Sequence, residues 1–324
     1  MLGEFELIAR YFAPLAADAP GAFGLTDDGA VLAGDGGPAR VITLDTLLAG
    51  THYLPQDPAD LVARKALRVN LSDLAAMGAR PEGYLLSLAL APEVPESWVD
   101  GFARGLSADQ AHYGVALLGG DTTRTSGPTA ISVTAIGTAD AVLRRSGARV
   151  GDRVYVSGTI GDAALGLAVA RGVAGDAGDP DSRALAARYR LPQPRVALGA
   201  ALCERGLASA AIDISDGLIA DLGHICRQSG VAADLALPRI PLSTAVQRRV
   251  EMDAAHLRTA LTGGDDYELV FTAPPENADA LAALARDLDL PLTGIGEVVP
   301  GGEVILRDPE GRPMTFDHAG WTHF

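Results

Sequence analysis

The sequence predicts a mixed protein of the α/β (or α+β) class, built from two domains. Strand and helix patterns alternate along the first half, and a turn-rich break at residues 146–152 separates it from a second patterned half. The chain has 324 residues, of which 48% are hydrophobic and 21% charged, an ordinary globular composition. A chain of this length can bury one large core or two ordinary ones. We therefore expect domains at residues 1–148 and 149–324.

The first half begins with a short amphipathic helix expected at 4–12, followed by a strand at 39–46 that is rich in β-branched residues. A helix is predicted over 58–77, because Pro58 suits a first turn and the leucines of this segment recur on one stripe. The other expected elements of this half are strands at 84–90, 115–118 (a buried one) and 129–137, and a helix at 96–113.

The second half opens with a strand expected at 153–157. A short strand at 211–214 leads directly into a helix at 217–229, and the Gly-, Asp- and Pro-rich segment 172–181 predicts an exposed loop. The other expected elements are helices at 162–172, 182–189, 195–205 and 277–288, and strands at 267–272, 292–299 and 304–307.

Charge and composition exclude several classes of protein. The net charge of −15 argues against a nucleic-acid binder, which would carry a basic face. The N-terminal residues carry acidic groups and lack the long apolar run of a signal peptide, and no segment has the ~20 apolar residues of a membrane span. Two cysteines provide neither a disulfide framework nor a zinc site. We therefore expect a cytoplasmic protein.

Lys65 is the only lysine in the chain. It is followed by Ala66 rather than Ser or Thr, and no Gly-rich loop precedes it, so a Walker A loop is excluded. A protein-kinase arrangement is equally disfavoured. If this protein binds ATP, it uses another kind of site.

Aspartates recur where predicted strands or helices end, nearly all next to glycine, serine or threonine. Most lie in apolar surroundings, where an unpaired carboxylate is costly. Two carboxylates about 4 Å apart repel by roughly 4 kcal/mol at an effective dielectric near 20, so convergent aspartates would need a cation, with Mg²⁺ as the natural candidate. The aspartates concerned are Asp28 (beside Asp27), Asp45, Asp73, Asp121, Asp213 and Asp216.

Several of these motifs also suit a phosphate. The glycines of GGDTT at 119–123 allow close backbone approach, and the strand-to-helix junction at 213–217 places a helix N-terminus where an anion is favoured. Arg144 and Arg145 could clamp a phosphate. Asn70 and Asp73 share one face of a predicted helix.

Each motif also has a simpler interpretation. The Asp27–Asp28–Gly29 run and the GGDTT segment could be tight turns. Ser215 or Asp216 could be a helix N-cap. The GGDDYE segment at 263–268 could be a solvated turn, the two arginines a surface charge pair, and a lone His52 a structural residue.

Taken together, the motifs resemble the thiamine-monophosphate kinase family. This family belongs to the ATP-binding superfamily that includes aminoimidazole ribonucleotide synthetase, selenophosphate synthetase and a hydrogenase maturation factor. The resemblance spans essentially the whole chain. It is carried by GEFELIARYF, TDDGAVL, DTLLAGTHY, NLSDLAAMGA, LLGGDTTR, LRRSGARVGD, AIDISDGLIADLGHI, GGDDYELVF and GWTHF.

The resemblance implies two α/β domains, the first of which pairs with its copy in a second subunit to build a β-barrel at the interface of a homodimer. It also implies the conversion of thiamine monophosphate and ATP to thiamine diphosphate with several Mg²⁺ ions. By resemblance, the metal-binding residues are Asp28, Thr43, Leu44, Asp45, Asp73, Asp121, Asp213 and Asp216. The nucleotide-binding residues are Tyr113, Gly120, Asp121, Arg145 and Ser215, and the substrate-binding residues are His52, Asp265 and Trp321.

The sequence departs from the family pattern at two of these positions. Leu44 stands where threonine is frequent, so a contact there would come from the backbone, and Asp265 stands where glutamate is usual. The expected chemistry is direct in-line transfer without a general base, because a phosphate monoester has its second pKa near 6 and is largely dianionic at neutral pH. The alternatives are a ligase like aminoimidazole ribonucleotide synthetase and a non-catalytic module that binds Mg²⁺ and nucleotide.

Overall fold

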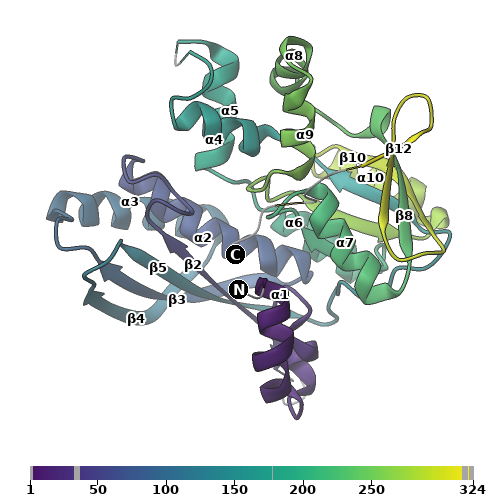
Figure 1. The fold of residues 1–324 in the computed structure, drawn as a ribbon. Coiled ribbons are helices and arrows are strands. Elements are labelled where there is room, and N and C mark those ends of the chain that lie inside the picture. The colour runs from purple at the N-terminus through teal and green to yellow at the C-terminus, as the bar shows by residue number, and fades with distance from the viewer. Residues whose placement is uncertain (1–2, 33–36, 177, 316–319, 321–324) are drawn as a thin grey trace.

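The structure, a computed structural model, describes residues 3–32, 37–176, 178–315 and 320. It contains two β-sheets, one from each half of the chain, with helices packed on and between them (Figure 1). Helices α4 Asp162–Ala170, α5 Pro180–Arg190, α8 Thr244–Met252 and α9 Ala255–Thr262 form an upper layer, and the N-terminal segment lies below the region where the two halves meet.

The first half forms a five-stranded sheet in the order β1-β2-β5-β3-β4. Neighbouring strands are antiparallel except β3 and β4, which are parallel and are connected through helix α3. The burial of β5 alternates residue by residue, because one face of the sheet packs on helices and the other stays open. The strands are β1 Ala30–Leu32, β2 Ala39–Leu48, β3 Arg80–Leu90, β4 Ala116–Arg124 and β5 Ala130–Ala139, and the helices are α2 Ala59–Ala76 and α3 Glu96–Tyr113.

The second half forms a seven-stranded sheet in the order β12-β11-β8-β10-β6-β9-β7. Its strands are β6 Arg153–Ser157, β7 Ala210–Asp213, β8 Ala232–Ala236, β9 Leu269–Ala273, β10 Leu292–Val299, β11 Val304–Arg307 and β12 Pro313–Met314. Its helices are α4 Asp162–Ala170, α5 Pro180–Arg190, α6 Val196–Glu204, α7 Leu218–Ser229, α8 Thr244–Met252, α9 Ala255–Thr262 and α10 Ala278–Asp287.

Helix α2 joins the two halves, since it packs on the first sheet and also contacts α6 and β7. The helices approach so closely that a Cβ atom at Gly199 would lie 1.9 Å from the carbonyl oxygen of Ala75. Arg68, which is 2% exposed, pairs with Asp109 at 2.6 Å and donates to the carbonyl of Pro192 at 2.7 Å. The contacts of α2 with α6 and with β7 place these elements side by side.

The predicted mixed α/β architecture is confirmed, but some elements differ from expectation. A buried strand was expected at 115–118, but the strand found there, β4, has all nine of its residues exposed. It is also longer than expected, because it continues through the GGDTT segment. Helical geometry does cover 4–12, with α1 at Glu4–Leu7 and a π-helical turn at Ile8–Phe12. Strands β8 and β12 and helices α8 and α9 were not predicted.

Candidate active site

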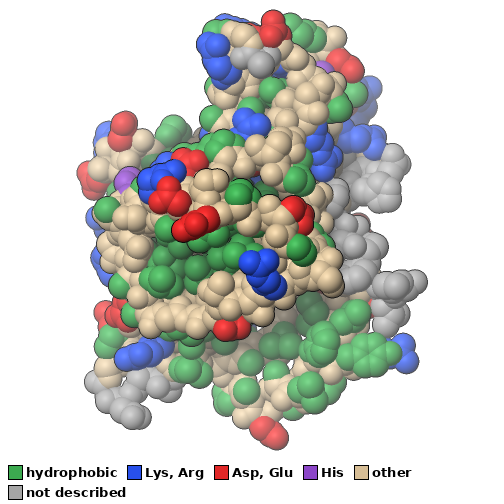
Figure 2. Space-filling model, turned by 90° about the vertical axis from the view of Figure 1, so that its left-hand side faces the viewer, with side chains coloured by type: hydrophobic (Ala, Val, Ile, Leu, Met, Phe, Trp, Pro, Cys, Tyr) green, Lys and Arg blue, Asp and Glu red, His purple; other side chains and the backbone are tan. Residues whose placement is uncertain are grey.

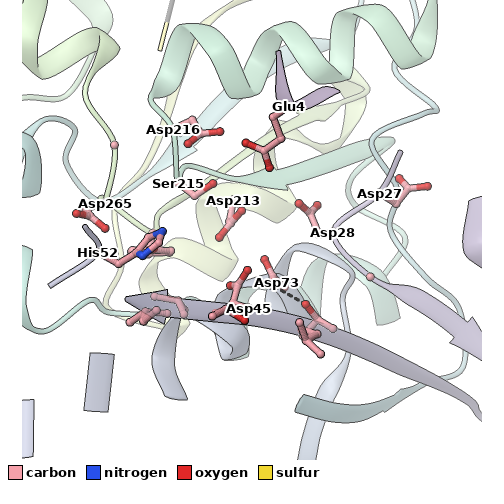
Figure 3. Close-up of a pocket in the computed structure, with 18 of the residues that line it drawn as sticks. Glu4, Asp27, Asp28, Asp45, His52, Asp73, Asp213, Ser215, Asp216 and Asp265 are labelled. Atoms are coloured by element: carbon pink, nitrogen blue, oxygen red, sulfur yellow. Dashed lines mark hydrogen bonds between the residues drawn. The ribbon is translucent and has the colours of Figure 1, made fainter. Parts of the chain in front are cut away.

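A cavity of about 710 Å³ lies between the two halves and is lined by β2, α2, the β7–α7 junction, the 263–267 loop and the N-terminal segment. Figure 3 shows acidic side chains that converge on it from elements far apart in the sequence. The predicted site residues that line it are Asp28, Thr43, Leu44, Asp45, His52, Asp73, Arg145, Asp213, Ser215, Asp216 and Asp265.

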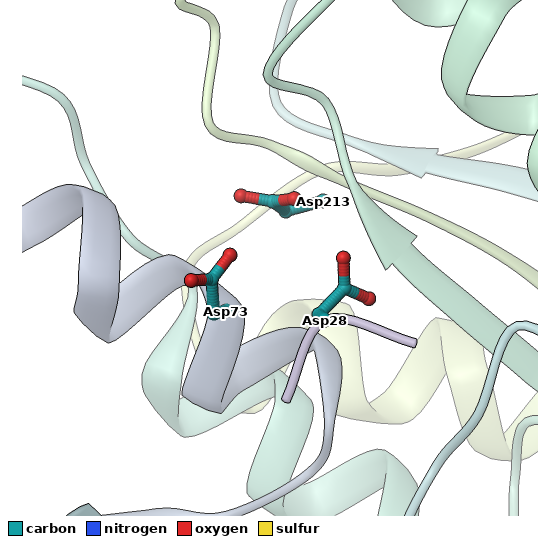
Figure 4. A group of neighbouring side chains, drawn as sticks. All are labelled: Asp28, Asp73 and Asp213. Carbon is teal, nitrogen blue, oxygen red and sulfur yellow. The ribbon is translucent and has the colours of Figure 1, made fainter. Parts of the chain in front are cut away.

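Three aspartates form the centre of this cavity. One carboxylate oxygen from each of Asp28, Asp73 and Asp213 lies within 4.8 Å of the other two (Figure 4). Burial, and then the carboxylates of Asp45, Asp213 and Asp28, raise the pKa of Asp73 well above its ordinary value. Burial, and then the carboxylate of Asp28, do the same to the pKa of Asp213. These three residues are called the acidic trio below.

The acidic trio has the chemistry of a site for a hard divalent cation. Oδ2 of Asp28 and Oδ2 of Asp213 are buried and accept no hydrogen bond within the described part of the chain. A buried carboxylate oxygen without a donor is costly, and a bound cation would compensate both. Carboxylate oxygens are also the ligands that Mg²⁺ prefers. The trio therefore fits Mg²⁺.

Strand β2 and helix α2 hold Asp73 in the trio. Asn70 and Asp73 are one turn apart on α2, and both face β2. The hydroxyl of Thr43 donates to Oδ2 of Asp73, and the backbone N–H of Asp45 donates to Oδ1 of Asn70 at 3.0 Å. Asn70 and Asp73, the first and last residues of NLSD, thus hold the helix against the strand at the site.

Two arginines pair with the adjacent acids Asp27 and Asp28, and one of them, Arg145, lines the cavity. Arg145 pairs with Asp28, and Arg144 pairs with Asp27 at 2.8 Å, so Asp27 points away from the trio (Figure 3). Nε of Arg145 is buried and makes no hydrogen bond to the described residues. Arg145, with only 16% of its side chain exposed, is therefore a buried cation at the edge of the cavity rather than part of a surface charge pair.

The β7–α7 junction contributes Asp213, Ser215 and Asp216. Helix α7 begins at Leu218, and neither Ser215 nor Asp216 caps it, which corrects one interpretation of the sequence. Instead, Oδ2 of Asp221, inside the first turn, accepts the backbone N–H groups of Asp216 and Gly217, each at 3.0 Å. This contact fixes the junction while leaving Ser215 and Asp216 on the cavity wall.

His52 and Asp265 lie together at the other end of the cavity (Figure 3). Nδ1 of His52 accepts the backbone N–H of Leu48 at 2.9 Å, which leaves Nε2 to carry the proton of the neutral ring. Of the three acids in the GGDDYE segment, only Asp265 lines the cavity. Asp266 accepts backbone N–H groups at the start of α4, and Glu268 pairs with Arg188 and Arg195, so this segment is not a solvated turn.

Other predicted site residues do not line this cavity. Gly120 and Asp121 lie on β4, three strands away from β2 in the sheet. At about 4.8 Å per strand, this separation is roughly 14 Å. Tyr113 ends α3, where its ring lies 5.3 Å from the guanidinium carbon of Arg68. Trp321 lies outside the described residues.

Three residues at the site were not predicted from the sequence. Glu4 lines the cavity, with its carboxylate pointing towards the acidic trio (Figure 3). Lys65 lines the cavity beside His52 and Asp265, and Asp221 supports the β7–α7 junction. Two signals were present: Lys65 is the only lysine, and Asp221 is an acid inside an otherwise apolar helical run.

Comparisons with known proteins agree with this fold. The family model for AIR synthase related protein, N-terminal domain, matches residues 26–139, and the model for the C-terminal domain matches residues 149–309. Among solved structures, "AaThiL complexed with AMPPCP and TMP" has a TM-score of 0.88 at 32% identity and covers 100% of this chain and 97% of its own. A crystal structure of hydrogenase maturation protein HypE in complex with ATP, at 20% identity and a TM-score of 0.72, shares the fold.

Curated relatives match over nearly the whole length. Thiamine-monophosphate kinase from Salmonella typhimurium is 46% identical, with 99% of this chain and 98% of the relative covered. The enzyme of that name from Caulobacter vibrioides is 43% identical, with 99% and 90% covered. The crystal structure of thiamine-monophosphate kinase from Stenotrophomonas maltophilia K279a has a TM-score of 0.77 at 42% identity, with 94% and 98% covered.

The two domains and the cavity between them define a protein of the AIR synthase related class. Within that class, the chain belongs to the thiamine-monophosphate kinase family. No helix in the described part of the chain is both long and apolar enough to cross a membrane.

Proposed function

We propose that this protein transfers the γ-phosphoryl group of ATP to thiamine monophosphate and so makes thiamine diphosphate. The acidic trio carries this proposal, because it offers cation ligands between a buried arginine at one end and a histidine and an aspartate at the other. A relative with a TM-score of 0.88 is complexed with AMPPCP, an ATP analogue, and TMP. We also propose that the protein works in the cytoplasm, where ATP is available.

The trio and its neighbours would hold Mg²⁺, which would neutralise the phosphate oxygens of both substrates. The ligand set that we propose is Asp28, Asp45, Asp73, Asp213 and Asp216, with Thr43 and the backbone at Leu44 beside them.

In this proposal, the two ends of the cavity bind different substrates. The guanidinium of Arg145 donates to a nucleotide phosphate through its buried Nε, and Ser215 binds the nucleotide from the β7–α7 junction. His52 and Asp265 bind thiamine monophosphate, together with Trp321. The attacking oxygen belongs to a phosphate that is already ionised, so positioning the two substrates in line takes the place of a general base.

We propose that the active form is a homodimer joined through the open face and edge of the first sheet. The exposed fractions of Leu44, Leu117 and Leu118 are 61%, 46% and 60%, and the whole of β4 is an exposed edge strand, which soluble proteins normally cover. Figure 2 shows hydrophobic side chains gathered on this side of the molecule. The described part of a single chain forms an open sheet, and a β-barrel would form only with a second copy.

This assembly would also give Asp121 and Gly120 a role. Both lie outside the cavity of their own chain, on the exposed β4 strand that the dimer would cover. We propose that these residues, with Tyr113, serve the nucleotide site of the partner chain. The boundary between residues 148 and 149 remains our proposal for the domain division, supported by the turns between β5 and β6.

A coupled assay for ADP release, with mass spectrometry of the product, tests the proposed reaction. We expect ADP and thiamine diphosphate in equal amounts when ATP, Mg²⁺ and thiamine monophosphate are present. ADP release with formylglycinamidine ribonucleotide instead would identify a ligase like aminoimidazole ribonucleotide synthetase. Binding of Mg-ATP without turnover of either compound would identify a non-catalytic module.

A further inference from the structure

Lys65 contacts three different elements at the end of the cavity where His52 and Asp265 lie. Its Nζ donates to the carbonyl oxygen of His52 at 3.0 Å, pairs with Oδ1 of Asp265 at 3.1 Å and lies 4.0 Å from the ring centroid of Tyr189. Only 3% of its side chain is exposed. A buried ammonium is tolerated only when it is paired, so these contacts are what keep Lys65 in place.

Asp265 adopts a positive φ angle, which is uncommon for residues other than glycine, although aspartate tolerates it better than most. Its φ angle is +74°, and its N–H donates to the carbonyl of Ser215 at 2.8 Å. Such strain persists only where the surroundings enforce it, and it is common at functional sites. With 26% of its side chain exposed, Asp265 faces the cavity while Lys65 holds one of its oxygens from behind.

Lys65, Arg145 and Arg171 are the cations that line the acidic cavity, and two of them pair with acids in different regions of it. Arg145 pairs with Asp28, whereas Lys65 pairs with Asp265 on the opposite side of the acidic trio. The ammonium of Lys65 is already engaged by Asp265, the carbonyl of His52 and the ring of Tyr189, and the carboxylate of Asp265 would repel a phosphate. A carboxylate held by a buried ammonium can still accept a hydrogen bond from a neutral N–H donor, so this region suits an amine-bearing ring.

We propose that Lys65 is a positioning residue that orients Asp265 towards the amine-bearing heterocycle of the substrate. This proposal rests on the proposed function, because thiamine monophosphate carries such an amine. Lys65 acts on the substrate through Asp265 and through the His52 loop, since its own ammonium is enclosed by protein. It determines how well the phosphoryl acceptor binds and leaves the nucleotide end unaffected.

Lys65→Met tests this role, because methionine keeps the bulk of the buried side chain and removes the charge. We expect the KM for thiamine monophosphate to rise about 10-fold or more, as for a lost hydrogen bond to a charged group, while the KM for ATP changes less than about twofold. The matched control is Arg64→Met, one residue earlier on α2. Arg64 also pairs with an aspartate, Asp109 at 2.9 Å, but does not line the cavity.

A double-mutant cycle with Asp265→Asn separates positioning from mere stability. If Lys65 acts through Asp265, Lys65→Met has little further effect on the KM for thiamine monophosphate once Asp265 is replaced. Independent, additive effects of the two replacements would overturn the proposal. If Lys65→Met does not fold, Lys65→Gln serves instead, since its amide can still donate to the His52 carbonyl without forming the ion pair.

A third readout uses oxythiamine monophosphate, which lacks the amine. The wild type is expected to discriminate against it, and Lys65→Met to lose most of that discrimination while the thermal midpoint stays close to that of Arg64→Met. If the wild type does not turn over thiamine monophosphate, the proposed reaction itself is overturned. If the wild type turns over thiamine monophosphate, but Lys65→Met raises the KM values for thiamine monophosphate and ATP equally or raises neither, only the role of Lys65 is overturned.

Discussion

The backbone N–H of Asp45 donates a hydrogen bond to Oδ1 of Asn70, 3.0 Å away, and so ties strand β2 to helix α2 next to the acidic trio. The amide of Asn70 also donates to the carbonyl of Ala66 at 3.0 Å, and the residue is fully buried. One asparagine therefore satisfies a strand donor and a helix acceptor together.

We expect Asn70→Ala to lower the free energy of unfolding by about 2 kcal/mol, because it removes the side-chain acceptor of the half-buried N–H of Asp45. Urea denaturation of the wild type and the variant measures this change. Affinity for Mg²⁺ is expected to fall as well, since β2 loses its register beside the trio. A stability within about 0.5 kcal/mol of the wild type would show that the Asp45–Asn70 contact contributes nothing.

Asp73→Asn removes one charge from the acidic trio. Without Mg²⁺, we expect the thermal midpoint to rise by a few degrees, because burial and three neighbouring carboxylates oppose the ionisation of Asp73. The rate of phosphoryl transfer is expected to fall by at least about 100-fold. Differential scanning fluorimetry with and without Mg²⁺ checks the first effect, and the ADP assay checks the second. Near wild-type activity would exclude Asp73 as a metal ligand.

We expect the protein to lose stability in mild acid because of the buried His224. Burial, and then the guanidinium of Arg145, lower the pKa of His224 to about 3, and its ring lies 4.4 Å from that of Phe5. The unfolded chain, whose histidine has a pKa of 6.5, therefore binds one more proton than the folded protein between about pH 3 and 6.5. This contribution to stability is complete above pH 6.5 and is lost as the pH falls.

At pH 5 this single group is expected to cost about 2 kcal/mol relative to pH 7.5. The acidic trio contributes in the opposite sense, because its raised pKa values favour the folded state as the pH falls. The informative measurement is therefore the difference between the wild type and His224→Gln in urea unfolding at both pH values. An identical pH dependence in the two proteins would contradict the prediction.

Mixing two inactive variants tests whether Asp121 serves the partner's site. In a dimer of one Asp73→Asn chain and one Asp121→Asn chain, one site would carry both changes and the other neither. After unfolding and refolding of an equal mixture, random pairing predicts about a quarter of wild-type activity. No recovery, in a sample shown by analytical ultracentrifugation to be dimeric, would place Asp121 in the site of its own chain or in no site.

The sequence was informative where one local pattern determines both an element and its role. The stripe of leucines predicted α2, and Asp73 on the same helix lies at the site. The short strand that leads into α7 was similarly visible, and it brings Asp213 to the cavity.

Other features depend on contacts that a single sequence does not encode locally. Lys65 and Asp265 pair although they are 200 positions apart, so the sequence near either residue does not predict the contact. Strand β4 has the composition of a buried strand, yet it is exposed in the single chain, because hydrophobic pattern does not reveal whether a surface is covered from within or by another molecule. Helix α8 (TAVQRRVEM) has nine residues and buries only Ala245 and Val246, too short an apolar pattern to identify a helix from the sequence.

The trio draws Asp28 and Asp73 from one half of the chain and Asp213 from the other, and the close approach of α6 to α2 at Gly199 fixes their separation. Cation affinity is therefore a property of how rigidly the halves are joined as well as of the carboxylates themselves. A bulkier residue at position 199 would wedge the helices apart and weaken Mg²⁺ binding from a distance, with every ligand still present. Evolution could thus adjust the Mg²⁺ affinity that we propose for this enzyme without changing a residue of the cavity.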